Sequence, residues 1–352
     1  MSAVGEQPGA GTLQADLVFE GGGVKGIGLA GAYRELSDRG YAPACVAGTS
    51  AGAITAALVA AGYTGAELEE IVLKDMDFEK FADETFLDRF SAPGELAQFL
   101  VSRGMHSGKY FLDWMRERLT AKQITTFGQL RDEHATDPRR TYRLQVIASD
   151  ITARSMLVLP RDATALGLDP DELEIAEAVR MSMSIPVFFK PVDVKDPHTG
   201  DQHMIVDGGM LSNYPIWLFD TDPGVKPTFP TFGMLLVAPD QTAPLLPTPP
   251  TGEQLPPIHN DIDFVRAIAE TMMEAHDRFY VDQANYARTI PIPTLGVGTT
   301  EFDITAARAS ALFESGRGAA KQFLDSWDFA AYIEQFRTGT PPTRRESLLA
   351  HT

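Results

Sequence analysis

The sequence predicts an α/β fold with a mainly parallel central sheet in a three-layer α/β/α arrangement. Two observations near the amino terminus carry this prediction. An apolar strand over Leu17–Glu20 runs into a glycine-rich turn and a helix that stops at Gly40. A second apolar strand ends at Gly48, before an alanine-rich helix that stops at Gly62. Alternation of strands and helices is typical of parallel strands that are joined by crossover helices.

The middle of the chain is predicted to add helices and then further strands. Residues from about 65 to 120 look largely helical, and one amphipathic segment carries the apolar side chains of Phe111, Trp114, Met115 and Leu119. Strand signals follow in four segments: Tyr142–Ile151, Ser155–Pro160, His203–Pro215 and Thr231–Pro239. The first two are expected to pair around a turn, and the third is expected to run into a glycine turn.

The last third is interrupted by a proline-rich excursion. Seven prolines between Pro239 and Pro257 exclude regular secondary structure there. A long helix is predicted over Asp263–Ala287, an edge strand over Thr289–Gly296 and a final helical region over Thr305–Trp327. We therefore expect one domain over 15–330, with a proline-rich insertion at 239–259 and tails at 1–14 and 331–352.

Composition indicates an acidic globular protein that does not bind nucleic acid. The 352 residues include 30 Lys or Arg and 48 Asp or Glu, for a formal net charge of −18. This charge opposes contact with nucleic acids and anionic membranes, so any membrane contact is expected to be transient, apolar and local. The single cysteine, Cys45, excludes an internal disulfide. With no signal peptide or apolar run of about 20 residues, the expected location is cytoplasmic.

The segment Gly48–Gly52, GTSAG, matches the pattern G-x-S-x-G, in which a serine occupies a tight turn between a strand and a helix. Small residues are needed on both sides of Ser50 because the strand and helix backbones converge there. The helix that follows offers free amides and a partial positive charge, which favour developing negative charge. The apolar strand before this short pattern and the alanine-rich helix after it favour Ser50 as a nucleophile.

A second glycine-rich turn, GGGVKG at Gly21–Gly26, also follows a strand and opens a helix. It matches the dinucleotide-binding pattern G-x-G-x-x-G, but the next strand ends in Gly48-Thr49-Ser50 rather than in the acidic residue that this pattern expects. A phosphate-binding loop would need Ser or Thr after Lys25, where Gly26 stands. Bare amides beside a nucleophile can instead hold an oxyanion, and this is the interpretation we favour.

A serine nucleophile needs a base, and an aspartate is the best candidate. Asp207 lies in IVDGGMLSNYP, where an apolar strand delivers a carboxylate directly into Gly208-Gly209. Its ordinary pKa of about 3.9 is low for a base, and an apolar pocket would raise it. None of the seven histidines lies in a glycine-flanked turn after a strand. They are His106, His134, His198, His203, His259, His276 and His351.

The three motifs GGGVKG, GTSAG and DGG, in this order and each at the end of a strand, resemble those of the patatin-like phospholipases. The resemblance extends from about Asp16 to Trp327. Further segments match the character of family blocks: Thr126–Leu130, Ala148–Pro160, Ala178–Val192 and Phe302–Leu324. One departure is MSMS at Met181–Ser184, where a smaller, alanine-rich run is expected, and it bears on the shape of the pocket.

The resemblance implies a lipid acyl hydrolase of the phospholipase A or lysophospholipase type, with a Ser–Asp dyad and a phospholipid or other lipid ester as substrate. It implies no metal and no organic cofactor. Carried over by position, it makes Ser50 the nucleophile and Asp207 the base. The amides of Gly22, Gly23 and Val24 become the oxyanion donors. The remaining motif glycines shape the turns: Gly21, Gly26, Gly48, Gly52, Gly208 and Gly209.

Other functions stay open at this point. An α/β-hydrolase-type esterase would use a histidine base, such as His259 or His276, and would satisfy the chain order Ser, Asp, His. Only two predicted strands precede Ser50, however, and that fold places several there. A nucleotide-binding module would rest on the glycine loop alone. An acyltransferase or a lipid carrier could also share the predicted fold.

Overall fold

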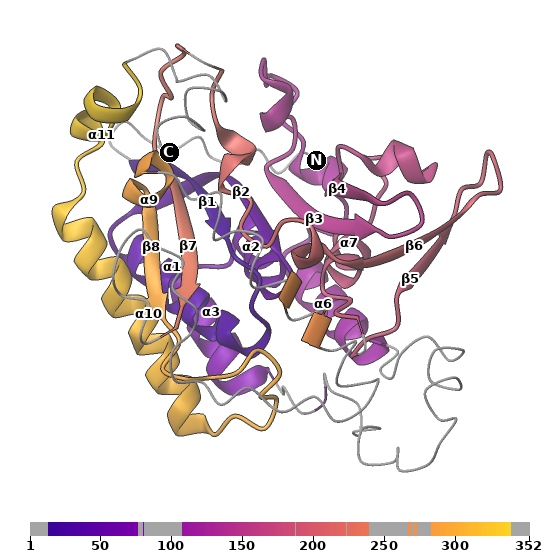
Figure 1. The fold of residues 1–352 in the computed structure, drawn as a ribbon, viewed down its shortest axis with the longest axis horizontal. Coiled ribbons are helices and arrows are strands. Elements are labelled where there is room, and N and C mark those ends of the chain that lie inside the picture. Colours follow the sequence, from indigo (N-terminus) through magenta and orange to yellow (C-terminus); the bar gives the residue numbers. More distant parts are fainter. Residues whose placement is uncertain are drawn as a thin grey trace.

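The central feature of the molecule is one eight-stranded sheet (Figure 1). The computed structural model describes residues 13–76, 80, 108–186, 188–222, 224–238, 267–268, 271–272 and 283–338. The strands are β1 (Leu13–Phe19), β2 (Tyr41–Thr49), β3 (Leu144–Asp150), β4 (Ser155–Leu159), β5 (Val192–Lys195), β6 (Gln202–Asp207), β7 (Thr231–Val237) and β8 (Thr289–Pro293). Hydrogen-bonded neighbours follow the order β5-β6-β3-β2-β1-β7-β8. The eighth strand, β4, pairs with β3 and is not part of this series.

The centre of the sheet is parallel and one side is antiparallel. β1 pairs in parallel with β2 and β7, β2 with β3, and β7 with β8. β3 pairs antiparallel with β4 and β6, and β5 pairs antiparallel with β6. Because parallel neighbours need a crossover connection, α1 (Ile27–Asp38) lies between β1 and β2, and α2 (Ala51–Ala60) follows β2. The predicted α/β fold with a mainly parallel central sheet is confirmed.

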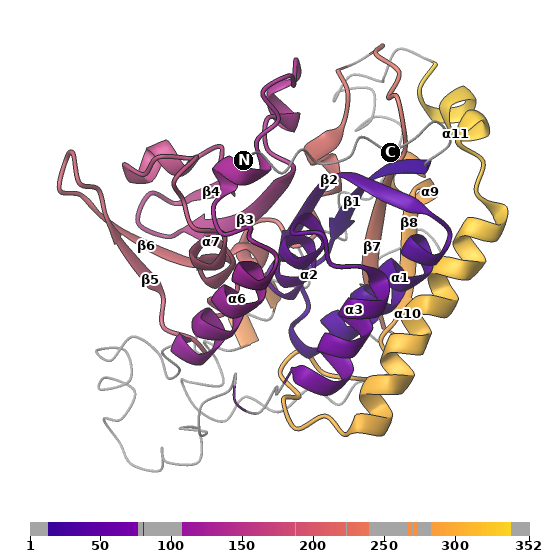
Figure 2. The same cartoon turned by 180° about the vertical axis from the view of Figure 1, so that it is seen from behind.

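The longer helices cover one face of the sheet, as the view from behind shows (Figure 2). The remaining helices are α3 (Gly65–Glu70), α6 (Lys109–Ala121), α7 (Ile175–Ser182), α9 (Gln283–Ala287), α10 (Ala306–Ser326) and α11 (Phe329–Phe336). A π-helical turn at Ile71–Asp75 extends α3. None of the helices in the described ranges is long and apolar enough to cross a bilayer.

The side chains of β1 are divided between two cores. Leu17 and Phe19 lie in the larger core, which also holds residues of α1, α2, α7 and α10. Val18 lies in a smaller core on the other face, where the 3-10 turn Ile216–Phe219 supplies the cover. A strand that is buried on both faces reads as a continuous apolar run, which explains the lack of alternation in this part of the sequence.

Several predicted elements are confirmed. The strand pair over Tyr142–Ile151 and Ser155–Pro160 is the antiparallel pair β3 and β4. The four apolar residues of the amphipathic segment are all buried on α6. β8 lies at the edge of the sheet, where its prolines are tolerated because no further strand needs their missing amide donors. The predicted final helical region is α10.

The first and last elements of the described chain extend beyond the predicted domain boundaries. β1 begins at Leu13, inside the segment predicted as a tail up to residue 14. α11 continues to Phe336, beyond the predicted domain end at 330, and the ring of its buried Tyr332 packs against that of Trp327, with ring centres 5.4 Å apart. The proline-rich excursion at 239–259 and most of the helix predicted over Asp263–Ala287 lie outside the described residues.

Candidate active site

Ser50 occupies the tight turn between β2 and α2, and its side chain is almost fully buried. Its backbone has φ 52° and ψ −124°, a conformation that costs about 1–3 kcal/mol for a residue with a β-carbon. The Ser50 carbonyl accepts hydrogen bonds from the amides of Ala53 and Ile54, at 2.9 and 3.3 Å, and so begins the helix. The sharp turn leaves the serine at the carboxyl end of β2, which is the edge of a parallel sheet where ligands bind.

Close backbone contacts explain the glycines on either side of this turn. A β-carbon at Gly48 would overlap the carbonyl oxygen of Gly52, and a β-carbon at Gly52 would overlap that of Phe19. The obstructing atoms belong to the backbone, so they cannot move aside as the end of a side chain can. The pattern G-x-S-x-G is therefore a packing requirement of the turn that presents Ser50.

Asp207 is the last residue of β6, and its side chain is completely buried. Burial raises the pKa of Asp207 to about 7, and hydrogen bonds from Ser50 and Gly209 oppose this shift. The Gly209 amide donates to Oδ1 at 2.8 Å. Oδ2 of Asp207 accepts no well-aligned hydrogen bond from the described part of the chain. The hydrogen bond between the Ser50 hydroxyl and this carboxyl is therefore poorly aligned. Such contacts are common before substrate binds.

The strand register brings the serine and the aspartate to one level of the sheet. Thr49 pairs with Ile147 of β3, and Asp207 pairs with the next residue of the same strand, Ala148. Because β4 pairs with Val146–Asp150 and so occupies one side of β3, the ends of β2 and β6 lie next to each other along the other side. This register therefore brings together a serine and a carboxyl that are 157 positions apart in the numbering.

The glycine loop Gly21–Gly26 follows β1 at the same edge of the sheet. Gly23 has φ 55°, and a β-carbon there would overlap the carbonyl oxygen of Thr299. Within the described ranges the amides of Gly22 and Gly23 have no acceptor, whereas the Val24 amide donates to the Thr299 carbonyl at 3.0 Å. Two of the three expected oxyanion donors are thus available in this structure, and the third is occupied.

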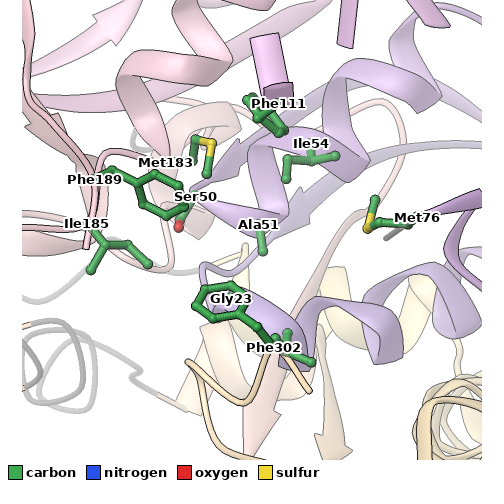
Figure 3. A pocket seen from close by; sticks show the side chains of 11 residues that line it. Gly23, Ser50, Ala51, Ile54, Met76, Phe111, Met183, Ile185, Phe189 and Phe302 are labelled. Carbon is green, nitrogen blue, oxygen red and sulfur yellow. The ribbon is translucent and has the colours of Figure 1, made fainter. Parts of the chain in front are cut away.

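A small apolar pocket of about 40 Å³ lies beside Ser50 (Figure 3). In this view Phe189 and Ile185 lie on one side of Ser50, and Ile54 and Met76 lie on the other. The pocket is lined by Gly23, Val24, Ser50, Ala51, Ile54, Met76, Phe111, Met183, Ile185, Phe189 and Phe302. Apart from Ser50, this lining offers only hydrocarbon, thioether and backbone groups, which suit an apolar ligand.

Sequence reasoning missed residues that fix the two reactive groups from outside their own turns. The Ser50 amide donates to Oγ of Ser182 at 2.8 Å, and the Asp207 amide donates to the carbonyl of Ser184 at 2.9 Å. Both serines belong to the MSMS segment. The sequence showed it as a departure from the family pattern, but without a reason.

Asn213 was also missed, and it supports the glycine loop. Its side-chain Nδ2 donates to the Gly21 carbonyl at 3.1 Å, and the backbone carbonyl of Asn213 accepts a hydrogen bond from the Gly21 amide at 3.0 Å. Its Nδ2 also lies 3.3 Å from Oε1 of Glu20. The signal was present in the sequence as the polar pair Ser212-Asn213 just after Gly208-Gly209.

None of the described histidines lines the pocket beside Ser50. Nδ1 of His203 lies 2.6 Å from Oδ2 of Asp150, and His134 and His198 are exposed. The candidate bases of the rival esterase, His259 and His276, lie outside the described residues, as do His106 and His351. Among the described residues, Asp207 is the acidic group that receives a hydrogen bond from Ser50.

The family model described as "Patatin-like phospholipase" matches residues 17–220, a range that contains both Ser50 and Asp207. This chain belongs to the patatin-like phospholipase family. Membership supports lipid hydrolase activity, with a lipid ester as the class of substrate.

Two relatives of this patatin-like chain are proteins of Bacillus subtilis and of a mimivirus. It is 37% identical to the protein YqhO of Bacillus subtilis (strain 168) over 321 residues, which cover 90% of this chain and 100% of YqhO. It is 24% identical to the protein R571 of Acanthamoeba polyphaga mimivirus over 311 residues, which cover 87% of this chain and 92% of R571.

A solved structure shares the fold. VipD from Legionella pneumophila matches the patatin-like chain with a TM-score of 0.50 and 19% identity, over 89% of this chain and 67% of VipD. At this identity the likeness concerns the fold alone. It agrees with the predicted mixed α/β architecture around a central sheet.

Proposed function

We propose that this protein is a serine acyl hydrolase that cleaves carboxylic esters of phospholipids or related lipids, through Ser50 as nucleophile and Asp207 as base. One observation carries the proposal. A serine on a strained elbow touches a fully buried carboxyl whose pKa is about 7, beside an apolar pocket. A base that is half ionised near neutral pH is well matched to proton transfer from a hydroxyl.

The first half of the reaction forms an acyl-enzyme. A bond forms between Oγ of Ser50 and the ester carbonyl carbon, the hydroxyl proton passes to Asp207, and the carbonyl oxygen becomes negative. The free amides of Gly22 and Gly23 are the proposed donors to this oxygen, and each donor of this kind lowers the barrier by about 3 kcal/mol. Collapse breaks the ester C–O bond, and the proton on Asp207 goes to the leaving alcohol or lysolipid.

The second half releases the fatty acid. Water attacks the acyl group on Ser50 and gives a proton to Asp207, and collapse returns that proton to Oγ of Ser50. The Val24 amide would join the other two donors only after it leaves the Thr299 carbonyl, which holds it at 3.0 Å. The proposed oxyanion site therefore works with two donors in the described conformation.

The pocket supports an acyl chain as the group that is bound next to Ser50. Its lining is apolar, so a hydrocarbon chain that leaves the lipid can make apolar contacts in the pocket. The lining offers no partner to a charged head group. A volume of about 40 Å³ has room for only a few water-sized groups. Entry of a long chain therefore requires flexible side chains such as Met76, Met183 and Phe302 to move.

The test combines covalent labelling with a lipid panel. We expect a fluorophosphonate probe to label the wild-type protein, and Ser50→Ala to abolish both labelling and release of fatty acid and lysolipid. Asp207→Asn should keep the fold but lose most of the turnover. The matched control is Ser149→Ala, which removes another buried serine hydroxyl near the end of a strand.

Each outcome separates the proposal from its rivals. Undiminished turnover in Ser50→Ala would reject the serine mechanism. Normal turnover in Asp207→Asn, together with loss in a histidine variant, would favour the esterase with a histidine base. Binding of NAD or ATP without any labelling would favour a nucleotide-binding module. Transfer of the acyl group to an added alcohol in preference to water would indicate an acyltransferase.

A further inference from the structure

The carboxyl-terminal turn of α7 lies against both proposed reactive groups. Oγ of Ser182 accepts the Ser50 amide at 2.8 Å, and the carbonyl of Ser184 accepts the Asp207 amide at 2.9 Å. Both serines are completely buried. Two residues of one turn therefore hold the backbones of the nucleophile and the base, which come from different strands.

The Ser50 amide needs an acceptor from outside its own turn. At φ 52° the chain has left the strand geometry of β2, and the amide of this first turn residue precedes the hydrogen bonds of α2. Because Ser50 is buried, water cannot serve it freely. The Ser182 hydroxyl satisfies this amide and so holds the elbow in its strained conformation.

The α7 turn is itself fixed by a buried arginine. Nη1 of Arg180 donates to Oγ of Ser184, and that hydroxyl donates to the Arg180 carbonyl at 2.8 Å. Nη2 of Arg180 donates to the Lys190 carbonyl at 2.8 Å, and the guanidinium lies 5.6 Å from the centre of the Phe189 ring. Arg180 therefore holds the segment that follows Ser182 through hydrogen bonds to Ser184 and to the Lys190 carbonyl.

We propose that Ser182 is a positioning residue, whose hydroxyl orients the nucleophile elbow toward Asp207. This inference rests on the proposed function. Ser182 does not line the pocket, although the neighbouring Met183 does, so its hydroxyl acts on Ser50 and not on the substrate (Figure 3). The alanine-rich run that the sequence pattern favours here would fill a similar volume but would leave the Ser50 amide without this acceptor.

The decisive variant is Ser182→Ala, measured against Ser149→Ala as the matched control. Oγ of Ser149 is buried in β3 and has no hydrogen-bond partner in the described ranges, so its removal tests the loss of a buried hydroxyl alone. We expect Ser182→Ala to lower kcat and the rate of fluorophosphonate labelling by about 10- to 100-fold, since small misplacements of a reacting group have effects of this size. KM for a soluble ester should stay close to the wild-type value, because the pocket is unchanged. Ser149→Ala should retain both rates.

Several results would overturn the inference. One is a normal labelling rate in Ser182→Ala, and another is an equal loss in both serine variants. If Ser182→Ala folds poorly, Ser182→Thr becomes the test, because it keeps a hydroxyl acceptor. Near-normal labelling per folded molecule is then expected, and loss of labelling in a folded Ser182→Thr protein would count against the role. The Ser50→Ala result is independent: activity that survives it rejects the proposed function, whereas the Ser182 variants decide the positioning role.

Discussion

At the scale of single residues, the environment of Asp207 decides what the site can do. A carboxyl with its ordinary pKa of about 3.9 is too weak a base to take a proton from a serine hydroxyl efficiently. Complete burial raises the pKa of Asp207 to about 7, and the hydrogen bonds from Ser50 and Gly209 only partly offset this effect. In the proposed mechanism, desolvation thus makes Asp207 a base suited to neutral pH.

This pKa predicts the pH dependence of the reaction. Asp207 accepts a proton only when it is ionised, so kcat/KM for a soluble ester should rise with pH through an apparent pKa near 7 and fall as the pH drops below it. Initial rates between about pH 5 and pH 9 would measure the profile. The Ser149→Ala variant should give the same curve. An ascending limb near pH 4 would contradict the assignment, because it would mean that the base is not the buried carboxyl.

At the scale of elements, parallel pairing of β1 and β2 is what brings the glycine loop and the elbow together. Both turns follow the carboxyl ends of their strands, and neighbouring parallel strands end at one edge of the sheet. β6, which pairs antiparallel with β3, reaches the same edge from the opposite direction and ends at Asp207, just before the turn at Gly208 and Gly209. The site therefore depends on tight turns whose glycines allow backbones to approach each other.

Replacing Gly52 with alanine tests this dependence. The new β-carbon would overlap the carbonyl oxygens of Phe19 and Glu20, which belong to the end of β1 and the loop that follows it. We expect Gly52→Ala to lower the free energy of unfolding by about 1–3 kcal/mol and to abolish labelling of Ser50. Chemical denaturation and the fluorophosphonate probe would measure the two effects.

The matched control is Gly318→Ala in α10, where an added β-carbon meets no atom within 4 Å. Alanine is favoured over glycine in a helix by up to about 1 kcal/mol, so this variant should be as stable as the wild type or more so. Wild-type stability and labelling in Gly52→Ala would show that the elbow tolerates the extra carbon, against the packing argument.

At the scale of the whole molecule, the net charge of −18 predicts how the protein would respond to a charged lipid surface. Anionic vesicles should repel it, and this repulsion extends about 30 Å at 0.01 M salt but about 10 Å at 0.1 M. The pocket beside Ser50 is apolar, so the contact that delivers an acyl chain does not require a charged lipid. The net charge therefore opposes the approach to an anionic membrane, whereas the apolar pocket would accept an acyl chain from that membrane.

This opposition predicts a salt effect that depends on the lipid. Hydrolysis of anionic vesicles should accelerate as salt is raised from about 0.01 M to 0.1 M, because screening removes the repulsion. Hydrolysis of zwitterionic vesicles and of a soluble ester should change little, and these two substrates serve as controls. Faster hydrolysis of anionic than of zwitterionic vesicles at low salt would point instead to a local basic surface that overrides the net charge.

The features that could be predicted from the sequence are those with local causes. The turns around Ser50 and Gly23, the strands that precede them and the order of the three motifs follow from apolar runs and from glycines that a backbone conformation or a close approach demands. The edge position of β8 follows equally from its prolines. Family membership was accessible for the same reason, since it rests on short motifs in a fixed order.

Other features depended on contacts between distant parts of the chain. Ser182 accepts the Ser50 amide across 132 positions, and Thr299 occupies the Val24 amide, and no local pattern encodes either contact. The pKa of Asp207 likewise depends on how completely the surrounding core excludes water. The sequence by itself determined which groups stand at the ends of the strands. Only the tertiary structure, through strand register and burial, decided which of them meet and in which state of ionisation.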